Sequence, residues 1–128
     1  MIRFKRLFKS FTYAFRGLVK TFREEQNLRI QTFIAFLVVL SGWYLDISRI
    51  EWCIIILAIG MVLLTEIINT AVEFITDILK PRIDDYVKVI KDIMAAAVMM
   101  SSIIAVIAGL IIFIPYLLRI VDFKHSVI

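Results

Sequence analysis

Three stretches of the chain carry no charged side chain and are long enough to suggest membrane spans. They run over Ile30–Leu45, Trp52–Thr65 and Ile93–Leu118. An α-helix needs about 20 apolar residues to cross the hydrocarbon core of a bilayer, and only the last stretch meets that length alone. The two shorter helices must therefore include flanking polar residues that reach the interface. Because a chain in lipid must satisfy its backbone hydrogen bonds internally, the pattern predicts three transmembrane helices, at about 28–46, 50–79 and 91–118.

The N-terminal segment shows a different, amphipathic pattern. Its apolar residues recur at helical spacing along one face: Phe4, Leu7, Phe8, Phe11, Phe15, Leu18 and Phe22. Basic residues fill the remaining face, and no acid precedes Glu24. A basic amphipathic helix of this kind lies in the plane of the lipid headgroups, so residues 1–24 are predicted to form a surface helix. The pattern alone favours a simple anchor. A sharper interpretation is that the helix also walls a site and brings Glu25 and Arg29 beside it.

The ends of the spans and the basic residues predict how the chain is oriented. Pro81 should end the second span near Lys80, because the residue before a proline is disfavoured in a helix, and Pro81–Val89 is then expected to be a polar connector. Twelve Lys and Arg residues lie before the first span or in the connector, and three lie on the other side. Basic loops stay in the cytoplasm. The N-terminus and the connector are therefore expected to face the cytoplasm, with the C-terminus outside.

The composition supports a single integral-membrane domain over residues 1–128. The chain is 62% hydrophobic and 20% charged, whereas soluble domains are about 45–50% apolar and about 25% charged. A lone cysteine, Cys53, excludes a disulfide within the chain. The net charge of +4 fits attraction to anionic headgroups, and no motif supports a nucleic-acid partner.

The strongest chemical signal is a stripe of polar residues on the second predicted span. Glu66, Asn69, Glu73 and Asp77 fall within an arc of about 80° on one side of the helix. Like charges four residues apart weaken a helix, and ionisable groups near a bilayer usually face the protein interior. Simple solvation of the helix end is a plausible explanation for Asp77 and a weak one for Glu66 and Asn69. The stripe therefore indicates a functional site.

These residue types suit phosphoryl transfer to a membrane alcohol. Two acids can hold Mg²⁺, which prefers oxygen ligands and keeps other positions for water or phosphate. A third acid, held out of water at the bilayer edge, suits a general base. Lys91 and Asp92 open the third span on the same side of the membrane, and a lysine offers a point charge for phosphate. The four scattered glycines form neither a Walker A loop nor the glycine-rich loop of protein kinases.

Two other functions remain open on these residues alone. The same carboxylates could line an oligomeric ion or proton channel, or the chain could be a non-catalytic membrane subunit. Asn69 and the Lys91-Asp92 pair favour the kinase. A chain with three spans has little interior in which to hide a polar stripe, so self-association is expected in either case.

At the stripe the sequence resembles the prokaryotic diacylglycerol kinase family, which includes the undecaprenol kinases of Gram-positive bacteria. The resemblance extends from about Arg6 to Pro115 and is carried by three motifs: Glu66-x-x-Asn69-Thr70-Ala71-Val72-Glu73-x-x-x-Asp77, Lys91-Asp92 and Ala95-Ala96-Ala97. It implies an all-α homotrimer in the bacterial inner membrane, with a surface helix, three spans per subunit and composite sites between subunits. It also implies ATP as phosphoryl donor, Mg²⁺ as cofactor and a lipid alcohol as acceptor.

The resemblance also implies a role for each matching residue. Glu66 resembles the general base, and Glu25 and Glu73 resemble the pair that holds the metal on the ATP phosphates. The nucleotide would contact Glu25, Glu73, Arg6, Tyr13, Lys91 and Asp92; the lipid would contact Arg6, Glu66, Asn69 and Ala95; Asp77 would shape the site.

The connector and the acceptor are less defined by the resemblance. The positions that contact nucleotide in the family's connector are occupied here by Arg82, Ile83 and Asp84, which depart from the family's pattern. The segment Gly109–Pro115 is similar to the undecaprenol kinase branch. The sequence nevertheless leaves both diacylglycerol and undecaprenol open as the acceptor.

Overall fold

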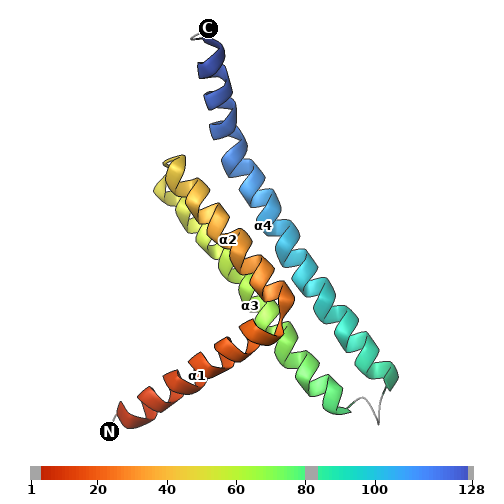
Figure 1. Ribbon diagram of the computed structural model, residues 1–128. Helices are drawn as coiled ribbons and strands as arrows, with labels where there is room; N and C mark the ends of the chain where they lie inside the picture. The colour runs from red at the N-terminus through yellow and green to blue at the C-terminus, as the bar shows by residue number, and fades with distance from the viewer. Residues whose placement is uncertain (1–3, 80–83, 127–128) are drawn as a thin grey trace.

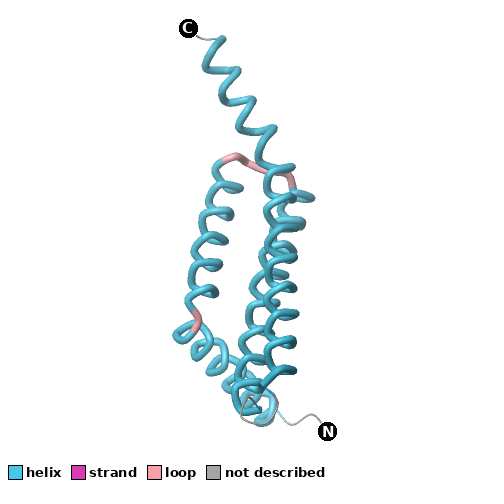
Figure 2. Tube along the Cα trace, turned by 90° about the vertical axis from the view of Figure 1, so that its right-hand side faces the viewer, coloured by secondary structure: helices cyan, strands magenta, loops and turns pink. Residues whose placement is uncertain are grey.

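The computed structural model describes the backbone of residues 4–79 and 84–126, and all its regular structure is helical. The elements in chain order are α1 (Phe4–Glu24), α2 (Gln26–Tyr44), α3 (Arg49–Leu79) and α4 (Asp84–Ser126). The helices α2, α3 and α4 run alongside one another, whereas α1 turns away at one end of them (Figure 1). The C-terminal part of α4 projects beyond the α2–α3 turn at the other end (Figure 2). For the described residues, the all-α class expected from the sequence is confirmed.

A tight turn joins α2 to α3. Asp46 adopts a positive φ of 51°, a conformation in which Asp is enriched among residues other than glycine. Ser48 and Glu51 then form a capping box: the Ser48 backbone N–H donates to Glu51 Oε2 at 2.7 Å, and the Glu51 N–H donates to Ser48 Oγ at 3.4 Å. Gly42 is buried against this turn, and a Cβ there would lie 3.0 Å from Cδ1 of Ile47. The turn therefore sets the pairing of α2 with α3.

The central element is α3, because it contacts each of the other three helices. A small apolar core of Ile47, Ile55 and Ile112 lies near the turn and joins α3 to α4. Two polar contacts support the same pair of helices. Thr65 Oγ1 and Ser101 Oγ lie 2.8 Å apart, and the hydroxyl of Tyr116 donates to Glu51 Oε2 at 2.7 Å.

Two described helices are long and apolar enough to cross a membrane. The candidate spans are Arg49–Ile78 and Asp85–Val121, and only 22% and 11% of their most apolar windows are buried. A core helix of a soluble protein would be mostly buried, so this exposure favours lipid as the surroundings. The helix α2 has only 19 residues, and polar side chains such as Arg29 and Gln31 occupy its first turns. The third predicted span thus remains a prediction.

The structure corrects both ends of the last predicted helix. Residues 84–89 begin α4 instead of forming a connector, and α4 continues through Pro115 to Ser126 instead of ending near 118. A negative charge in the first turn, here Asp85, favours a helix start, and Val87 is buried. The predicted ends lie at charged residues. Such residues limit the part of a helix that can lie in lipid, but the helix itself can continue beyond them. The side chains of Arg82, Ile83 and Asp84 lie outside the residues that the structure describes.

Candidate active site

The side chain of Glu66 is the most deeply buried carboxylate in the described part of the chain. It lies on α3 and is 1% exposed. Gln31 on α2 donates a hydrogen bond from Nε2 to Glu66 Oε2 at 2.9 Å. Thr70, one turn further along α3, donates its hydroxyl to the backbone carbonyl of Glu66 at 3.0 Å. A carboxylate is thus held between two helices by a neutral amide.

The next two residues of the stripe form a second hydrogen-bonded unit. Asn69 donates from Nδ2 to Glu73 Oε1 at 2.9 Å, as the spacing of four residues on a helix allows. The hydroxyl of the buried Thr76 donates to the Glu73 backbone carbonyl, so it does not compete for the carboxylate. Asn69 Oδ1 is buried and has no partner among the described protein atoms. The carboxylate of Glu73 is therefore oriented while retaining free lone pairs.

Glu25 reaches the same region from the corner between α1 and α2. It occupies the N-cap position of α2 with extended backbone, and its side chain makes no capping hydrogen bond. Arg29 stabilises the corner by donating from Nη1 to the backbone carbonyls of Phe22 and Arg23, at 3.3 and 2.7 Å. Burial, followed by the negative charges of Glu73 and Glu66, raises the pKa of Glu25 above its ordinary value. The corner thus brings Glu25 close enough to Glu66 and Glu73 for their charges to interact.

Lys91 and Asp77 are brought together at the start of α4. The ammonium of Lys91 forms an ion pair with Asp77 Oδ1 and so joins α4 to α3. Asp92 and Ala95, further along α4, are exposed. Lys91 and Asp77, for which the resemblance implies separate roles, therefore interact directly.

The surface helix α1 is only partly connected to this region. Lys20 places its Nζ 4.8 Å from the centre of the Phe74 ring, next to Glu73, which is close enough for a cation–π contact. Arg6 and Tyr13 are exposed, and their side chains make no hydrogen bond or ion pair within residues 4–79 and 84–126. A single chain therefore does not bring these two residues to the carboxylates.

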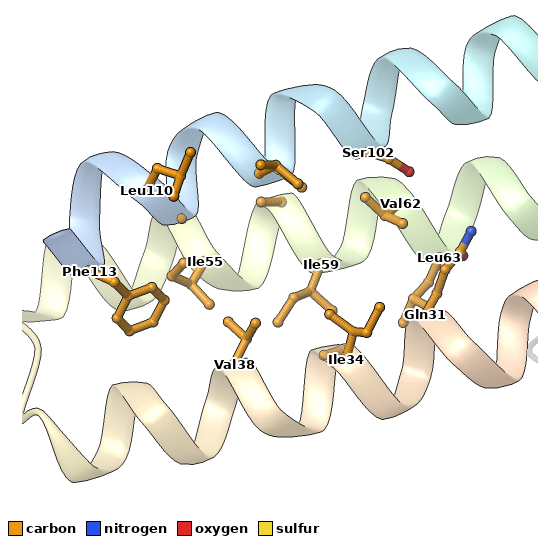
Figure 3. Close-up of a pocket in the computed structure, with 15 residues that line it drawn as sticks. Gln31, Ile34, Val38, Ile55, Ile59, Val62, Leu63, Ser102, Leu110 and Phe113 are labelled. Carbon is orange, nitrogen blue, oxygen red and sulfur yellow. The ribbon is translucent and has the colours of Figure 1, made fainter.

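An apolar groove lies between α2, α3 and α4, and Gln31, the hydrogen-bond partner of Glu66, is one of the residues that line it. Its volume is about 370 Å³, and Gln31 and Ser102 lie toward one end while Phe113 lies at the other (Figure 3). Apolar side chains such as Ile34 and Ile59 line the space between them. Sequence reasoning missed both Gln31 and the groove. An amide within an otherwise apolar run was the available signal, but it does not identify the partner on another helix.

The described residues include no group of three or more Asp, Glu, His or Cys side chains arranged to hold a metal ion. The expected pair of Glu25 and Glu73 has the hard oxygen donors that Mg²⁺ prefers. Two protein carboxylates are sufficient for this ion because it commonly keeps water and substrate phosphate as its other ligands. The chemistry of the donors fits Mg²⁺ bound together with a nucleotide.

Comparison with known proteins identifies the family. The sequence profile of the prokaryotic diacylglycerol kinases matches residues 12–113. The chain is 39% identical over 112 residues to undecaprenol kinase from Bacillus subtilis, covering 88% of this chain and 91% of that protein. It is 33% identical over 113 residues to diacylglycerol kinase from Synechocystis, covering 88% and 65% respectively. For diacylglycerol kinase from Escherichia coli K12 the identity is 29% over 104 residues, covering 81% and 85%.

These matches confirm the resemblance seen in the acidic motif. They favour the kinase over the channel and over a non-catalytic subunit. The chain belongs to the prokaryotic diacylglycerol kinase family and is a lipid kinase.

Proposed function

We propose that this lipid kinase transfers the γ-phosphoryl group of ATP to the hydroxyl of undecaprenol or diacylglycerol, in a Mg²⁺-dependent reaction at the cytoplasmic face of the bacterial inner membrane. The observation that carries the proposal is the buried carboxylate of Glu66, which accepts a hydrogen bond from Gln31, a residue that lines an apolar groove. Of the two acceptors, undecaprenol is favoured by the 39% identity to the B. subtilis protein of that name, against 33% and 29% for the two diacylglycerol kinases.

In the proposed reaction Glu66 acts as the general base. Only one of its oxygens, Oε2, accepts the hydrogen bond from Gln31, so Oε1 is left for the acceptor hydroxyl. The lipid O–H bond breaks and its proton passes to Glu66, while the lipid oxygen forms a bond to the γ-phosphorus. The bond between the γ-phosphorus and the β,γ-bridging oxygen breaks, and ADP leaves. Such a transfer requires mainly positioning and neutralisation of charge from the protein.

The other carboxylates would bind the nucleotide through the metal. Glu73, oriented by Asn69, and Glu25, whose pKa is raised by burial and by the neighbouring acids, would be the two protein ligands of Mg²⁺. The metal, when bound, would neutralise charge on the transferring phosphates. Lys91, held by Asp77, would contact phosphate directly, with Asp92 as a further nucleotide contact.

The lipid would enter from the bilayer. Its hydrocarbon chain would lie in the groove between α2, α3 and α4, which leaves the hydroxyl near Glu66. Asn69, Ala95 and Arg6 would contact the headgroup.

The full site requires more than one chain. Arg6 and Tyr13 are exposed and unconnected to the carboxylates of their own chain, so we propose that the surface helix of a neighbouring subunit supplies them in a homotrimer. We also propose α2 as a third transmembrane helix, with the N-terminus in the cytoplasm as the distribution of basic residues favours. Native mass measurement in mild detergent that shows only monomers would contradict the trimer.

One assay tests the proposed reaction. The purified protein is reconstituted in lipid bilayers that contain either undecaprenol or diacylglycerol, and transfer of label from γ-labelled ATP to each lipid is measured with and without Mg²⁺. The control is a variant in which residues 25, 66 and 73 are all changed from Glu to Gln. Labelling that requires Mg²⁺ and is absent in the control supports the proposal. Equal labelling by the triple variant would refute it.

A further inference from the structure

The proposed reaction uses the Glu66 oxygen that Gln31 leaves free, but it assigns no role to the Gln31 side chain itself. Among the described residues, Gln31 is the only side chain that hydrogen-bonds to the Glu66 carboxylate. A carboxylate can accept about four hydrogen bonds, and a buried charge with few partners is costly to maintain. Glu66 is 1% exposed, so the amide donor of Gln31 has a large effect on where this carboxylate points.

The other half of the same amide has no partner. Gln31 Oε1 is buried and accepts no hydrogen bond from the described protein atoms. A buried acceptor without a partner is uncommon and has an energetic cost. In the Gln31 amide, Nε2 therefore donates a hydrogen bond to Glu66, whereas Oε1 remains free to accept one.

The location of Gln31 connects the carboxylate with the groove. Gln31 lies on α2, whereas Glu66 lies on α3, and Gln31 also lines the groove that runs toward Phe113 (Figure 3). A lipid chain bound in this groove would contact the side chain that holds the carboxylate.

We propose that Gln31 is the positioning residue of the general base and that it supports Glu66 in both of its protonation states. Before proton transfer, Nε2 donates to the carboxylate, as the structure shows. The lipid hydroxyl then gives its proton to Glu66, and the lipid oxygen bonds to phosphorus. The proton arrives on Glu66 Oε1, whereas Gln31 contacts Oε2. A half-turn of the Glu66 carboxyl group together with a half-turn of the Gln31 amide brings the new O–H opposite Gln31 Oε1, which accepts its hydrogen bond. Gln31 itself neither gains nor loses a proton.

This inference rests on the proposed function, and it explains why an amide occupies the position. A lysine would only donate and would favour the ionised carboxylate throughout the reaction. A methionine of similar size would do neither. A histidine can do both, because a neutral imidazole carries one donor and one acceptor nitrogen.

The test compares three variants in the reconstituted lipid kinase assay. Gln31→Met removes both hydrogen-bonding functions with little change in size, and Gln31→His keeps both. Thr32→Val is the matched control on the same helix, because the Thr32 hydroxyl donates only to the Leu28 backbone carbonyl, at 2.7 Å. For each variant, kcat and the KM values for ATP and lipid are measured.

We expect Gln31→Met to lower kcat by about tenfold to a hundredfold, which corresponds to the loss of one hydrogen bond to a charged group. The KM for ATP should stay within about twofold, because the nucleotide contacts are elsewhere. Gln31→His should keep at least about a fifth of the wild-type kcat, since it retains a donor and an acceptor. Thr32→Val should match the wild type.

The assay distinguishes a failure of the proposed role of Gln31 from a failure of the proposed function. A Met variant with wild-type kcat, or a His variant below a fifth, would overturn the role of Gln31 while the wild-type kinase activity still stands. Should the Met variant fail to enter the membrane, the His variant decides alone by the same threshold. A wild-type protein that labels neither lipid would instead contradict the proposed function.

Discussion

Replacement of Glu66 by Gln, compared with the same replacement at Glu73, gives the most direct test of the proposed division of roles. Both substitutions keep the size and shape of the side chain and remove one negative charge. Gln31 could still donate to the amide oxygen at position 66, and Asn69 could still donate to the one at position 73. The fold is therefore expected to survive both changes, and the differences should appear in kinetics.

The expected effect at position 66 is a loss of turnover. An amide cannot accept the lipid proton, and a positioned general base typically contributes about 10²–10⁴-fold to the rate, or about 3–5 kcal/mol of activation free energy. The KM for ATP should change little, because Glu66 is held by α2 and is not a proposed ligand of the metal. The Glu66→Gln variant should thus bind nucleotide normally and turn over slowly.

The expected effect at position 73 is the reverse. Altering even an outer-shell partner of a metal site typically costs about 10–100-fold in affinity or activity, so loss of a ligand should cost at least as much. The KM for Mg²⁺·ATP should rise by at least tenfold, while kcat at saturation should fall much less than for Glu66→Gln.

Initial rates measured against ATP, Mg²⁺ and lipid, with both variants in the same bilayers, separate the two effects. The proposed roles would be refuted by a Glu66→Gln variant whose kcat stays within tenfold of the wild type. They would also be refuted if both variants raised the KM for Mg²⁺·ATP equally with kcat unchanged, since the two acids would then both be binding groups.

Three further predictions test other parts of the structure. Tyr116→Phe removes the hydroxyl that donates to Glu51 Oε2 at 2.7 Å and should lower the free energy of unfolding by about 0.5–1.5 kcal/mol; an unchanged denaturation midpoint in detergent would contradict this contact. Gly42→Ala should lower the free energy of unfolding by about 1–3 kcal/mol, because its Cβ would lie 3.0 Å from a side chain of the adjoining turn. Gly60→Ala, which has open space around the added Cβ, is the control: its denaturation midpoint in detergent should be unchanged or higher. Because the pKa of Glu25 is raised, this carboxyl should take up a proton at a higher pH than an ordinary glutamate does, and the KM for Mg²⁺ should rise as the pH falls through that range. A Glu25→Gln variant should lose this pH dependence. A KM for Mg²⁺ that does not change with pH in the wild type would count against Glu25 as a ligand.

The parts of the site within one helix could be predicted from spacing alone. Glu66, Asn69 and Glu73 lie on one face because the helical repeat is local and fixed. The contact between Asn69 and Glu73 follows from their separation of four residues. No property of the rest of the fold is needed to place these residues together.

The contact between Gln31 and Glu66 could not be predicted in this way. The two residues are 35 positions apart, and their approach depends on how the α2–α3 turn sets the pairing of the two helices. The start of α4 was missed for a different reason. Hydropathy reports where a chain can contact lipid, whereas the helix continues as long as its backbone hydrogen bonds do, so it already includes polar residues such as Asp85.

The ion pair of Lys91 with Asp77 joins a residue of the polar stripe on α3 to a residue on another helix, α4. Its side chains are 36% and 61% exposed, and exposed ion pairs contribute only about 0–1 kcal/mol. Apolar packing around Ile55 and Ile112 therefore holds α4 on α3, and the ion pair adds little to that association. Its main consequence is to restrict a long, flexible ammonium group to the end of the carboxylate stripe. A cation kept in one place in this way is suited to meeting a phosphate, because less side-chain entropy remains to be lost when the phosphate binds.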